Sequence, residues 1–594
     1  MPHDPSLAHR LFGPWQRRGL LFIPPTVPQR HGEMENIKAY VTYSELRGTE
    51  PTLDYFIAQL RGVGLRSLLF SLSRLITVLH NDGVSRLELQ GRLRDQALTP
   101  DMLARLRQLE NWSERIIFFP QQILLTAKMA LLHSPDRDDQ RPDPEFRDVL
   151  VELLLMAADF LDRLELPEDR HELERVMIAH QVRNYLMNTT EQFRYMIPRA
   201  SLLYLKLPLA PEFRGDPDYV DLPAVFRVAS GFDLKDYLAF GFALLSWFIE
   251  QSYLRDTYQE ERARSNPHTF FSTSTIDPAL AHRLLENFVH THTSAKAAFE
   301  ARIGDASRLT YDFLPFMAKP LYRIRDDAVV PMHLGYLEAR FTNGIYWTIF
   351  DHLQGEDRLR FARFFGRIFE AYVRRSFQRS MPDEPGLARR VFPEFIYRSP
   401  QGERKTSDLI LLYPRTAIFL EATASRIRLE ATAISGNLSA FEADVAKIIL
   451  ENARQLTHRI RDFRNGLYSF EGVTGRDIDR IYPVIATIHS IPESTIIWDH
   501  IRNMLADRRL LIDPGVERLQ LIDVEEVEIL ETILPQGVSL LEVLEARAAD
   551  PERRNIGLKN FLIAKFREGA NEFLRAEYQE IAEHAKRLLF ETVG

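Results

Sequence analysis

Apolar residues follow two different patterns along this chain. Up to about residue 345 they recur at intervals of three and four residues, which predicts helices joined by polar or proline-rich connections. The expected helices cover residues 55–80, 102–112, 146–164, 171–195 and 237–249, with a helix start at Asp277-Pro278 and connections at 134–145 and 207–223. This region shows no repeat of fixed period, and its pattern indicates no function.

Beyond residue 358 short apolar runs interrupt the helical spacing. An amphipathic helix is expected over 358–377, with Glu370 at the border of its apolar face. The expected strands are 391–397, 408–413, 417–420, 482–489 and 519–524, with turns at 399–404 and Pro414-Arg415 and further helices at 440–463 and 558–591. The order of helix, three strands, helix and strand predicts an α/β core in this part of the chain.

Length and composition limit the class of protein. A chain of 594 residues is long enough for about two to four domains, and 45% hydrophobic with 27% charged residues is ordinary for a soluble globular protein. Because there is no cysteine, disulfides and thiolate metal sites are excluded, and oxygen or imidazole ligands favour Mg, Mn or Ca over structural zinc. We expect a cytoplasmic protein with no membrane segment, since the apolar stretch 237–249 is too short to span a bilayer.

Charge is distributed unevenly along the chain. The formal net charge is −8, yet the segment from Arg358 to Arg428 holds fifteen Lys or Arg and only seven Asp or Glu. Positive charge near acidic metal ligands is what a site that cuts a phosphodiester needs, because the polyanion has to be held there. The alternative interpretation is a basic helix and loop that face water.

Two acidic residues stand at the ends of neighbouring predicted strands. Asp408 opens the apolar run 408–413, and Glu421 closes the run 417–420 after the turn at Pro414-Arg415. Two like charges buried side by side are costly unless a cation neutralises them, one takes a proton, or Arg or Lys partners approach. The pair therefore suggests a divalent cation site, with basic partners as the structural alternative.

These residues and this order of elements resemble the PD-(D/E)XK nuclease superfamily over roughly residues 358–535. Asp408 matches the first motif carboxylate and Glu421 the second, while Glu370 resembles the acid on the first helix and Gln455 the glutamine on the following helix. The motif lysine is missing, because Thr423 stands in its place. Either the site is inactive or the amine comes from another element, for which Lys447 is the first candidate and Lys405 the second.

The resemblance implies a set of roles for the site residues. Mg or Mn would be held by Asp408, Glu421, the backbone carbonyl of Ala422 and Glu370, with Lys447 and Gln455 completing the catalytic group. The expected nucleic-acid contacts are Lys405, Arg426, Arg454 and Arg459.

The expected organisation follows from the pattern and the resemblance together. Residues 1–345 form a mostly helical recognition, regulatory or oligomerisation region, with two subdomains if it divides near 207–223. Residues 346–535 form a restriction-endonuclease-like α/β domain, and 536–594 a helical C-terminal segment. The expected function is metal-dependent hydrolysis of nucleic acid, with DNA as the first choice, in a prokaryotic defence effector. The alternatives are a catalytically inactive nuclease-like protein that binds nucleic acid or acts as a scaffold, and a purely structural helical protein.

Two weaker motifs lie in the helical region. His290 and His292 have the alternate spacing of a metal pair on a strand, although a surface or capping role is more common. Asp136, Asp138 and Asp139 resemble a calcium loop but lack its glycine and its distal glutamate.

Overall fold

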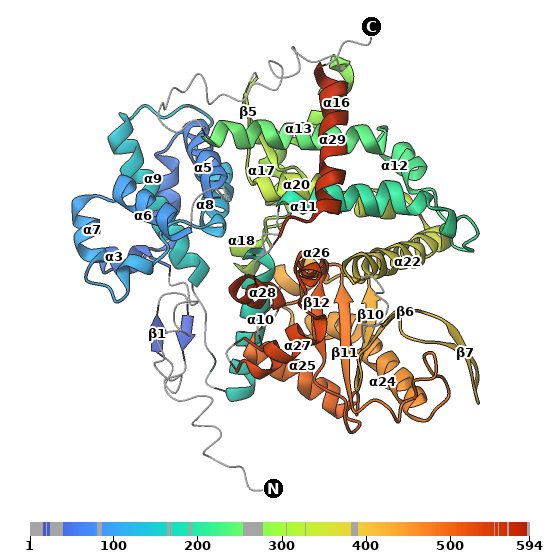
Figure 1. Ribbon diagram of the computed structural model, residues 1–594. Helices are drawn as coiled ribbons and strands as arrows, with labels where there is room; N and C mark the ends of the chain where they lie inside the picture. Colours follow the sequence, from blue (N-terminus) through green and yellow to red (C-terminus); the bar gives the residue numbers. More distant parts are fainter. Residues whose placement is uncertain are drawn as a thin grey trace. The chain divides into compact units, whose positions relative to one another are not determined.

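The computed structural model is a mixed α/β structure with two compact units (Figure 1). It describes residues 16–18, 21–23, 40–79, 86–162, 167, 169–188, 193–253, 277–304, 306–326, 328–381, 390–492, 494–551, 553–555, 557–566 and 569–590. Unit 1 comprises Met1–Leu166, Gly241–Arg340 and Lys586–Gly594, and unit 2 comprises Pro167–Phe240 and Phe341–Ala585.

Unit 1 is mainly helical. Its helices are α3 (Tyr43–Arg47), α4 (Leu53–Arg61), α5 (Leu65–Leu79), α6 (Arg86–Ala97), α7 (Pro100–Leu106), α8 (Pro120–His133), α9 (Asp143–Asp162), α16 (Pro278–Glu286), α17 (His292–Glu300), α18 (Ala306–Tyr311), α19 (Leu314–Ala318) and α20 (Leu334–Phe341). A small sheet has the order β3 (Val289–His290), β4 (Leu321–Arg325), β5 (Ala328–Pro331), and β1 (Gln16–Arg18) pairs with β2 (Leu21–Ile23). Helix α8 is buried along most of its length, so α4, α5, α9 and α17 pack around it.

The helix expected over 55–80 is divided into α4 and α5 at Gly62–Gly64. A Cβ on Gly64 would lie 2.5 Å from the backbone of Asp138 and Asp139, so only glycine permits this close approach. The N–H of Leu65 donates to the carbonyl of Pro135, which fixes the start of α5 against that loop. Among the described residues no single helix is long and apolar enough to cross a membrane; α4 and α5 meet that test only when joined across their bend of 111°.

Unit 2 contains a mixed five-stranded sheet. Its order is β12 (Gln520–Asp523), β11 (Arg480–Thr487), β10 (Thr416–Thr423), β9 (Leu409–Leu412), β6 (Arg390–Pro393). Strands β10, β11 and β12 are parallel neighbours, as Figure 1 shows, whereas β9 is antiparallel to both β10 and β6. The central strand β10 is buried along nearly all of its length, so its side chains pack on both faces of the sheet.

Helices cover both faces of this sheet. The other helical segments of unit 2 are α10 (Arg170–Asn188), α11 (Phe193–Ala200), η2 (Ser201–Lys206), η3 (Leu207–Leu209), η4 (Pro211–Phe213), α12 (Leu222–Ser230), α21 (Asn343–His352), α22 (Gly355–Ser380), η5 (Glu430–Ile434), α23 (Leu438–Val445), η6 (Ala446–Leu450), α24 (Glu451–Arg464), α25 (Thr495–Asp507), α26 (Val524–Ile533), η7 (Leu534–Gln536), α27 (Leu540–Ala549) and α28 (Leu558–Lys565). Helices α13 (Leu234–Tyr253), α20 and α29 (Glu572–Phe590) have residues in both units. Phe419 of β10 packs with Phe463 of α24, whereas α22 contacts β10 and β6.

Most of the elements expected after residue 358 are confirmed, but two of them are divided. The strand expected over 391–397 splits at Glu394 and Phe395, so that β6 joins the main sheet and β7 (Ile396–Ser399) pairs with β8 (Gly402–Lys405) instead. The turn expected over 399–404 is therefore mostly a hairpin. The helix expected over 558–591 is interrupted between α28 and α29.

Ion pairs attach the proline-rich segment 207–223 to α22. Arg367 binds Asp216 at 2.5 Å, and Arg363 binds Asp218 at 2.9 Å. Because these contacts lie within unit 2, residues 167–240 belong with the sheet, whereas the sequence suggested a boundary near 345. The segment also neutralises part of the positive charge of α22.

A buried charged network fixes α22 against α26. The guanidinium of Arg199 donates to both carboxylate oxygens of Glu528 at 2.7 Å, and the hydroxyl of Tyr372 on α22 donates to Glu528 at 2.6 Å. Arg199 and Glu528 are both buried. Since α22 carries Glu370, this network also determines where that carboxylate lies.

Glu528→Ala is therefore expected to destabilise the protein by about 3–5 kcal/mol, because it leaves the buried charge of Arg199 without its carboxylate. Urea unfolding of the full chain followed by circular dichroism measures the loss. The matched control is Glu580→Ala, which removes an exposed partner of Lys206 and is expected to cost less than about 1 kcal/mol. Equal losses in the two variants would contradict the assigned role.

Candidate functional site

The register of β9 and β10 brings the two sequence-identified acids together. Leu409 pairs with Leu420, so Asp408, which directly precedes β9, lies opposite Glu421. The backbone N–H of Ala422 donates to Asp408 Oδ2 at 2.8 Å and holds that carboxylate at the end of the sheet. Glu421 shares its strand face with Phe419, which packs against α24.

Two further carboxylates lie within electrostatic range of this pair. Glu370 of α22 has its pKa raised mainly by burial and then by the charges of Asp408 and Glu394. Glu394 lies in the connection between β6 and β7. We call Glu370, Glu394, Asp408 and Glu421 the acid cluster. The sequence analysis identified three of its members and missed Glu394. Glu394 directly follows Pro393, and a proline inside a predicted strand indicates that the strand could end there.

Burial dominates the electrostatics of the acid cluster. Glu421 is 2% exposed, and burial followed by the charge of Asp408 raises its pKa. Burial also raises the pKa of Asp408, while the N–H of Ala422 and the charge of Arg459 act in the opposite direction. Burial therefore favours the protonated, neutral form of these acids.

Arg459 supplies the closest positive charge. Its guanidinium forms an ion pair with Glu421, and the two side chains are 15% and 3% exposed. The sequence suggested that Arg459 contacts phosphate, whereas in the structure it reaches from α24 to the second motif acid. This is the kind of basic partner that the structural alternative required.

The two candidate lysines have different surroundings. Lys405 Nζ lies 2.8 Å from Glu394, and its charge lowers the pKa of both Glu370 and Asp408. Lys447 is exposed on η6, and within the described part of the chain no hydrogen bond or ion pair joins it to the acid cluster. Gln455 and Arg454 are likewise exposed on α24 without such a contact. Gln455 nevertheless shares a helix face with Arg459, four residues further on.

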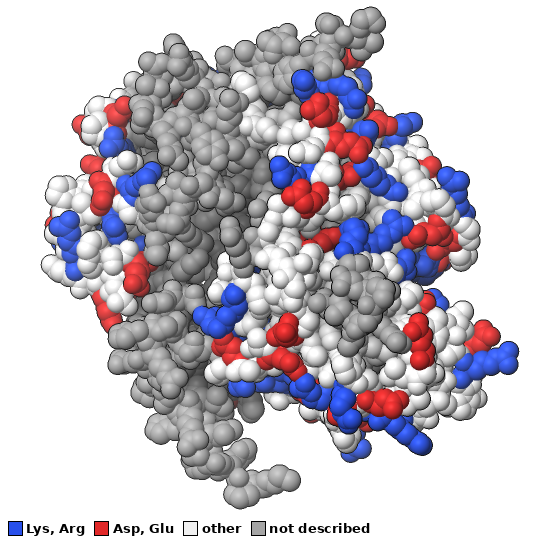
Figure 2. Space-filling model, viewed as in Figure 1, with Lys and Arg blue, Asp and Glu red and all other residues white. Residues whose placement is uncertain are grey.

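Much of the basic segment is paired with carboxylates from outside it. Arg404 binds Asp462, Arg415 binds Asp479 and Arg428 binds Asp444. Figure 2 shows the same mixture of signs over the described part of one face. These pairs reduce the positive charge that the segment offers to a polyanion.

Arg426, expected to contact nucleic acid, is also engaged within unit 2. Its guanidinium lies 3.8 Å from the ring centroid of Tyr346 and donates to the carbonyl of Ala424 at 3.1 Å. Nε of the same side chain lies 3.2 Å from Nε2 of His489. This half-buried arginine therefore stabilises the turn after β10.

Carboxylate oxygens are the donors that Mg and Mn prefer. Among the residues that the structure describes, no three His, Asp or Glu side chains lie close enough together to hold a metal ion. The carboxylates of the acid cluster nevertheless fit a divalent cation in donor type, and binding of such an ion would favour their deprotonated form.

The weaker motifs have structural partners. His290 is buried, with Nδ1 3.0 Å from the Ser294 hydroxyl and Nε2 3.1 Å from the Pro315 carbonyl. Asp136, Asp138 and Asp139 form ion pairs with Arg66, Arg325 and Arg141, respectively. The resemblance of these aspartates to a calcium loop therefore reflects arginine pairing.

Comparison of the chain with protein-family models, with curated proteins and with solved structures gives no match. The assignment of the site therefore depends on the geometry of unit 2 and on the motif residues themselves.

Arg459→Met is expected to destabilise the protein by about 1–3 kcal/mol, because the buried Glu421 carboxyl loses its closest polar partner. Urea unfolding measures the change, with Arg454→Met, an exposed change on the same helix, expected to remain within about 0.5 kcal/mol. Adding Glu421→Gln to Arg459→Met should restore part of the loss. Strictly additive losses in the double variant would show that the two side chains are not coupled.

The acid cluster also predicts how stability depends on pH. The pKa of Glu370 and of Glu421 is raised to about 8 in the folded protein. Between about pH 5 and pH 8 these two acids therefore bind more protons in the folded state than in the unfolded state. Their contribution to stability therefore falls as pH rises through this window. Because Mg or Mn favours the deprotonated acids, either ion should raise the melting temperature more near about pH 8 than near about pH 6.

Scanning fluorimetry with Mg, Mn or EDTA measures this difference. Asp408→Asn provides the comparison, since it removes one candidate ligand and should reduce the ion-dependent shift. A shift that is the same at both pH values, or unchanged in Asp408→Asn, argues against a cation at these acids.

Proposed function

We propose that this chain is a metal-dependent nuclease with its active site at the acid cluster of unit 2. The observation that carries the proposal is the strand pairing that places Asp408 opposite Glu421, with Glu370 of α22 within electrostatic range of Asp408. The elements follow in the order α22, β6, β9, β10, α24 and β11, with β9 antiparallel and β11 parallel to β10. This order supports the resemblance to the PD-(D/E)XK superfamily.

The roles of the acids follow from their positions. Asp408, Glu421 and the backbone carbonyl of Ala422 would hold Mg or Mn, with Glu370 as a further ligand. When bound, the ion polarises the phosphate and lowers the pKa of water. The N–H of Ala422 orients Asp408, and Arg459 orients Glu421 and adds positive charge beside the site of phosphate binding.

The contacts of Lys405 make it our choice for the catalytic amine in place of the motif lysine. Its ammonium lies at Glu394 and acts electrostatically on two other members of the acid cluster, whereas Lys447 has no described contact with them. A lysine at this edge could orient the attacking water. Gln455, on the helix face of Arg459, is suited to bind a phosphate oxygen.

DNA is the proposed first-choice substrate, in a role such as prokaryotic defence. The supporting side chains lie outside the ion pairs of the basic segment, in which Arg404, Arg415 and Arg428 are already engaged. Exposed Lys447 and Arg454 on the helical run from η6 to α24 remain suited to phosphate contacts.

A second function is favoured by one specific observation. Arg459 forms an ion pair with Glu421, and Thr423 stands where the resemblance expects a lysine. Such a site would suit a catalytically inactive protein that binds nucleic acid or acts as a scaffold.

The deciding experiment incubates the full chain with linear DNA, circular DNA and RNA in the presence of Mg, Mn or EDTA. Cleavage is expected only with a divalent ion and should fall at least about 100-fold in Asp408→Ala and in Glu421→Ala. Glu403→Ala, which changes an exposed acid of the β7–β8 hairpin, is the matched control and should retain activity. Circular dichroism confirms that each variant is folded.

The variants Lys405→Ala and Lys447→Ala distinguish the two lysines. Loss of cleavage in Lys405→Ala alone supports the assignment from the structure, and loss in Lys447→Ala alone refutes it. Cleavage that survives both Asp408→Ala and Glu421→Ala removes the acid cluster as the active site. Binding without cleavage under every condition favours the inactive protein.

A further inference from the structure

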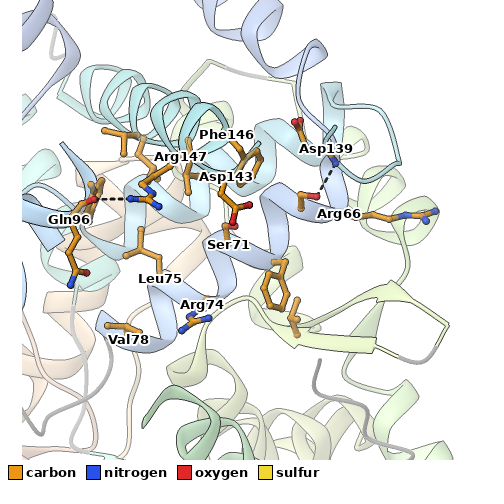
Figure 3. A pocket seen from close by; sticks show the side chains of 18 of the residues that line it. Arg66, Ser71, Arg74, Leu75, Val78, Gln96, Asp139, Asp143, Phe146 and Arg147 are labelled. Carbon is orange, nitrogen blue, oxygen red and sulfur yellow. Dashed lines mark hydrogen bonds between the residues drawn. The ribbon is translucent and has the colours of Figure 1, made fainter. Parts of the chain in front are cut away.

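Unit 1 contains a cavity of about 840 Å³ that is separate from the acid cluster (Figure 3). Its walls are α5, α6, α9, the loop before α9, and strands β4 and β5. Figure 3 shows Arg74, Leu75 and Val78 of α5 together with Phe146 and Arg147 of α9. A volume of this size is typical of sites for small molecules.

Charge in the cavity wall is mainly positive. The charged lining residues are Arg66, Arg74, Arg92, Arg141, Arg147 and Arg325, with Asp138, Asp139 and Asp143. Asp138 pairs with Arg325, Asp139 pairs with Arg141, and Arg66 pairs with Asp136 outside the lining. Arg74, Arg92 and Arg147 also line the cavity, so that six arginines and three aspartates contribute to its wall. Arginines grouped in this way favour a ligand with more than one negative charge.

The same cavity has a large apolar surface. Phe70, Phe118 and Phe146 line it, together with aliphatic side chains such as Leu75 and Leu150. Aromatic and aliphatic walls bind a planar, weakly polar group well, and arginine can also stack on such a group. The ligand that fits both properties has an aromatic body joined to anionic groups.

The wall of the cavity is held in place before any ligand binds. The Asp139 carboxylate accepts from the N–H of Gly64 at 2.8 Å, and the N–H of Asp139 donates to the Ser67 hydroxyl at 2.9 Å. The N–H of Arg66 also donates to the carbonyl of Arg137 at 3.2 Å. Because this loop is already fastened to α5, ligand binding does not need to order it.

We propose that this cavity binds a nucleotide. The phosphates would lie at Arg74 and Arg147, and the base would pack against Phe146. The cavity is a second binding site, independent of the nuclease activity proposed for unit 2. Neither the sequence pattern of this region nor its three neighbouring aspartates had indicated it.

Isothermal titration calorimetry of the full chain with ATP, adenosine and inorganic tripolyphosphate tests this proposal. EDTA is present throughout, so that no divalent ion can link a phosphate to the acid cluster. ATP is expected to bind at least about tenfold more tightly than adenosine or tripolyphosphate, because it alone supplies both the base and the charge. Arg74→Ala and Arg147→Ala should each weaken ATP binding by at least about tenfold.

Two further variants make the result specific. Phe146→Ala should weaken ATP binding and leave tripolyphosphate binding unchanged. Arg283→Ala removes an exposed arginine of α16 in the same unit and should have no effect. No binding of any probe at millimolar concentration, or ATP binding that Arg74→Ala and Arg147→Ala leave unchanged, overturns the proposal. Equal affinity for ATP and tripolyphosphate also overturns the proposal, because it shows that the cavity binds the phosphate groups without recognising the base.

Discussion

The burial of several carboxylates at one end of a sheet is the constraint on which the candidate site depends. Strand pairing places Asp408 opposite Glu421, and α22 adds Glu370 from another element. Water is largely excluded from Glu421, so its charge has to be met by the protein, a proton or an ion. Arg459 supplies a positive charge, yet burial still raises the pKa of Glu421 and favours its protonated form.

The same need for paired charge explains how α22 is held. Its outer arginines bind Asp216 and Asp218, while its buried Tyr372 meets Glu528, which Arg199 neutralises. These contacts come from segments far apart in the sequence, and they fix the helix that carries Glu370. Arginines that looked available to a polyanion in the sequence are thus part of the structural framework of unit 2.

The sequence predicted the parts of the site that depend on local pattern. The turn at Pro414-Arg415 joins two apolar runs, which is enough to place Asp408 opposite Glu421 once the runs pair as strands. The spacing of apolar residues likewise placed Glu370 at the border of its helix. Glu394 was missed because the strand expected over 391–397 divides there, and β7 leaves the main sheet for a hairpin.

Contacts between distant segments could not be obtained from pattern alone. Lys447 and Arg459 both lie on the helical run after β10. The spacing of apolar residues predicts that this run is helical, but it does not predict which of the two basic side chains reaches Glu421. Likewise, the sequence shows Asp136, Asp138 and Asp139 only as part of a polar loop. In the structure Arg66 of α5 pairs with Asp136, and Arg325 of β4 pairs with Asp138. Such partners are fixed by tertiary packing, which local sequence does not encode.

Under the proposed nuclease function, Thr423 stands where the family motif has a lysine, so the ion pair of Arg459 bears directly on activity. A lysine on β10 would have placed its charge from the same strand as Glu421, whereas the guanidinium of Arg459 arrives from α24 and is planar and always charged. A divalent ion at Glu421 would have to share this carboxylate with Arg459. The strength of that ion pair, compared with the attraction of the acid cluster for a cation, therefore bears on the choice between the two proposed functions, a metal-dependent nuclease and a catalytically inactive binding or scaffold protein.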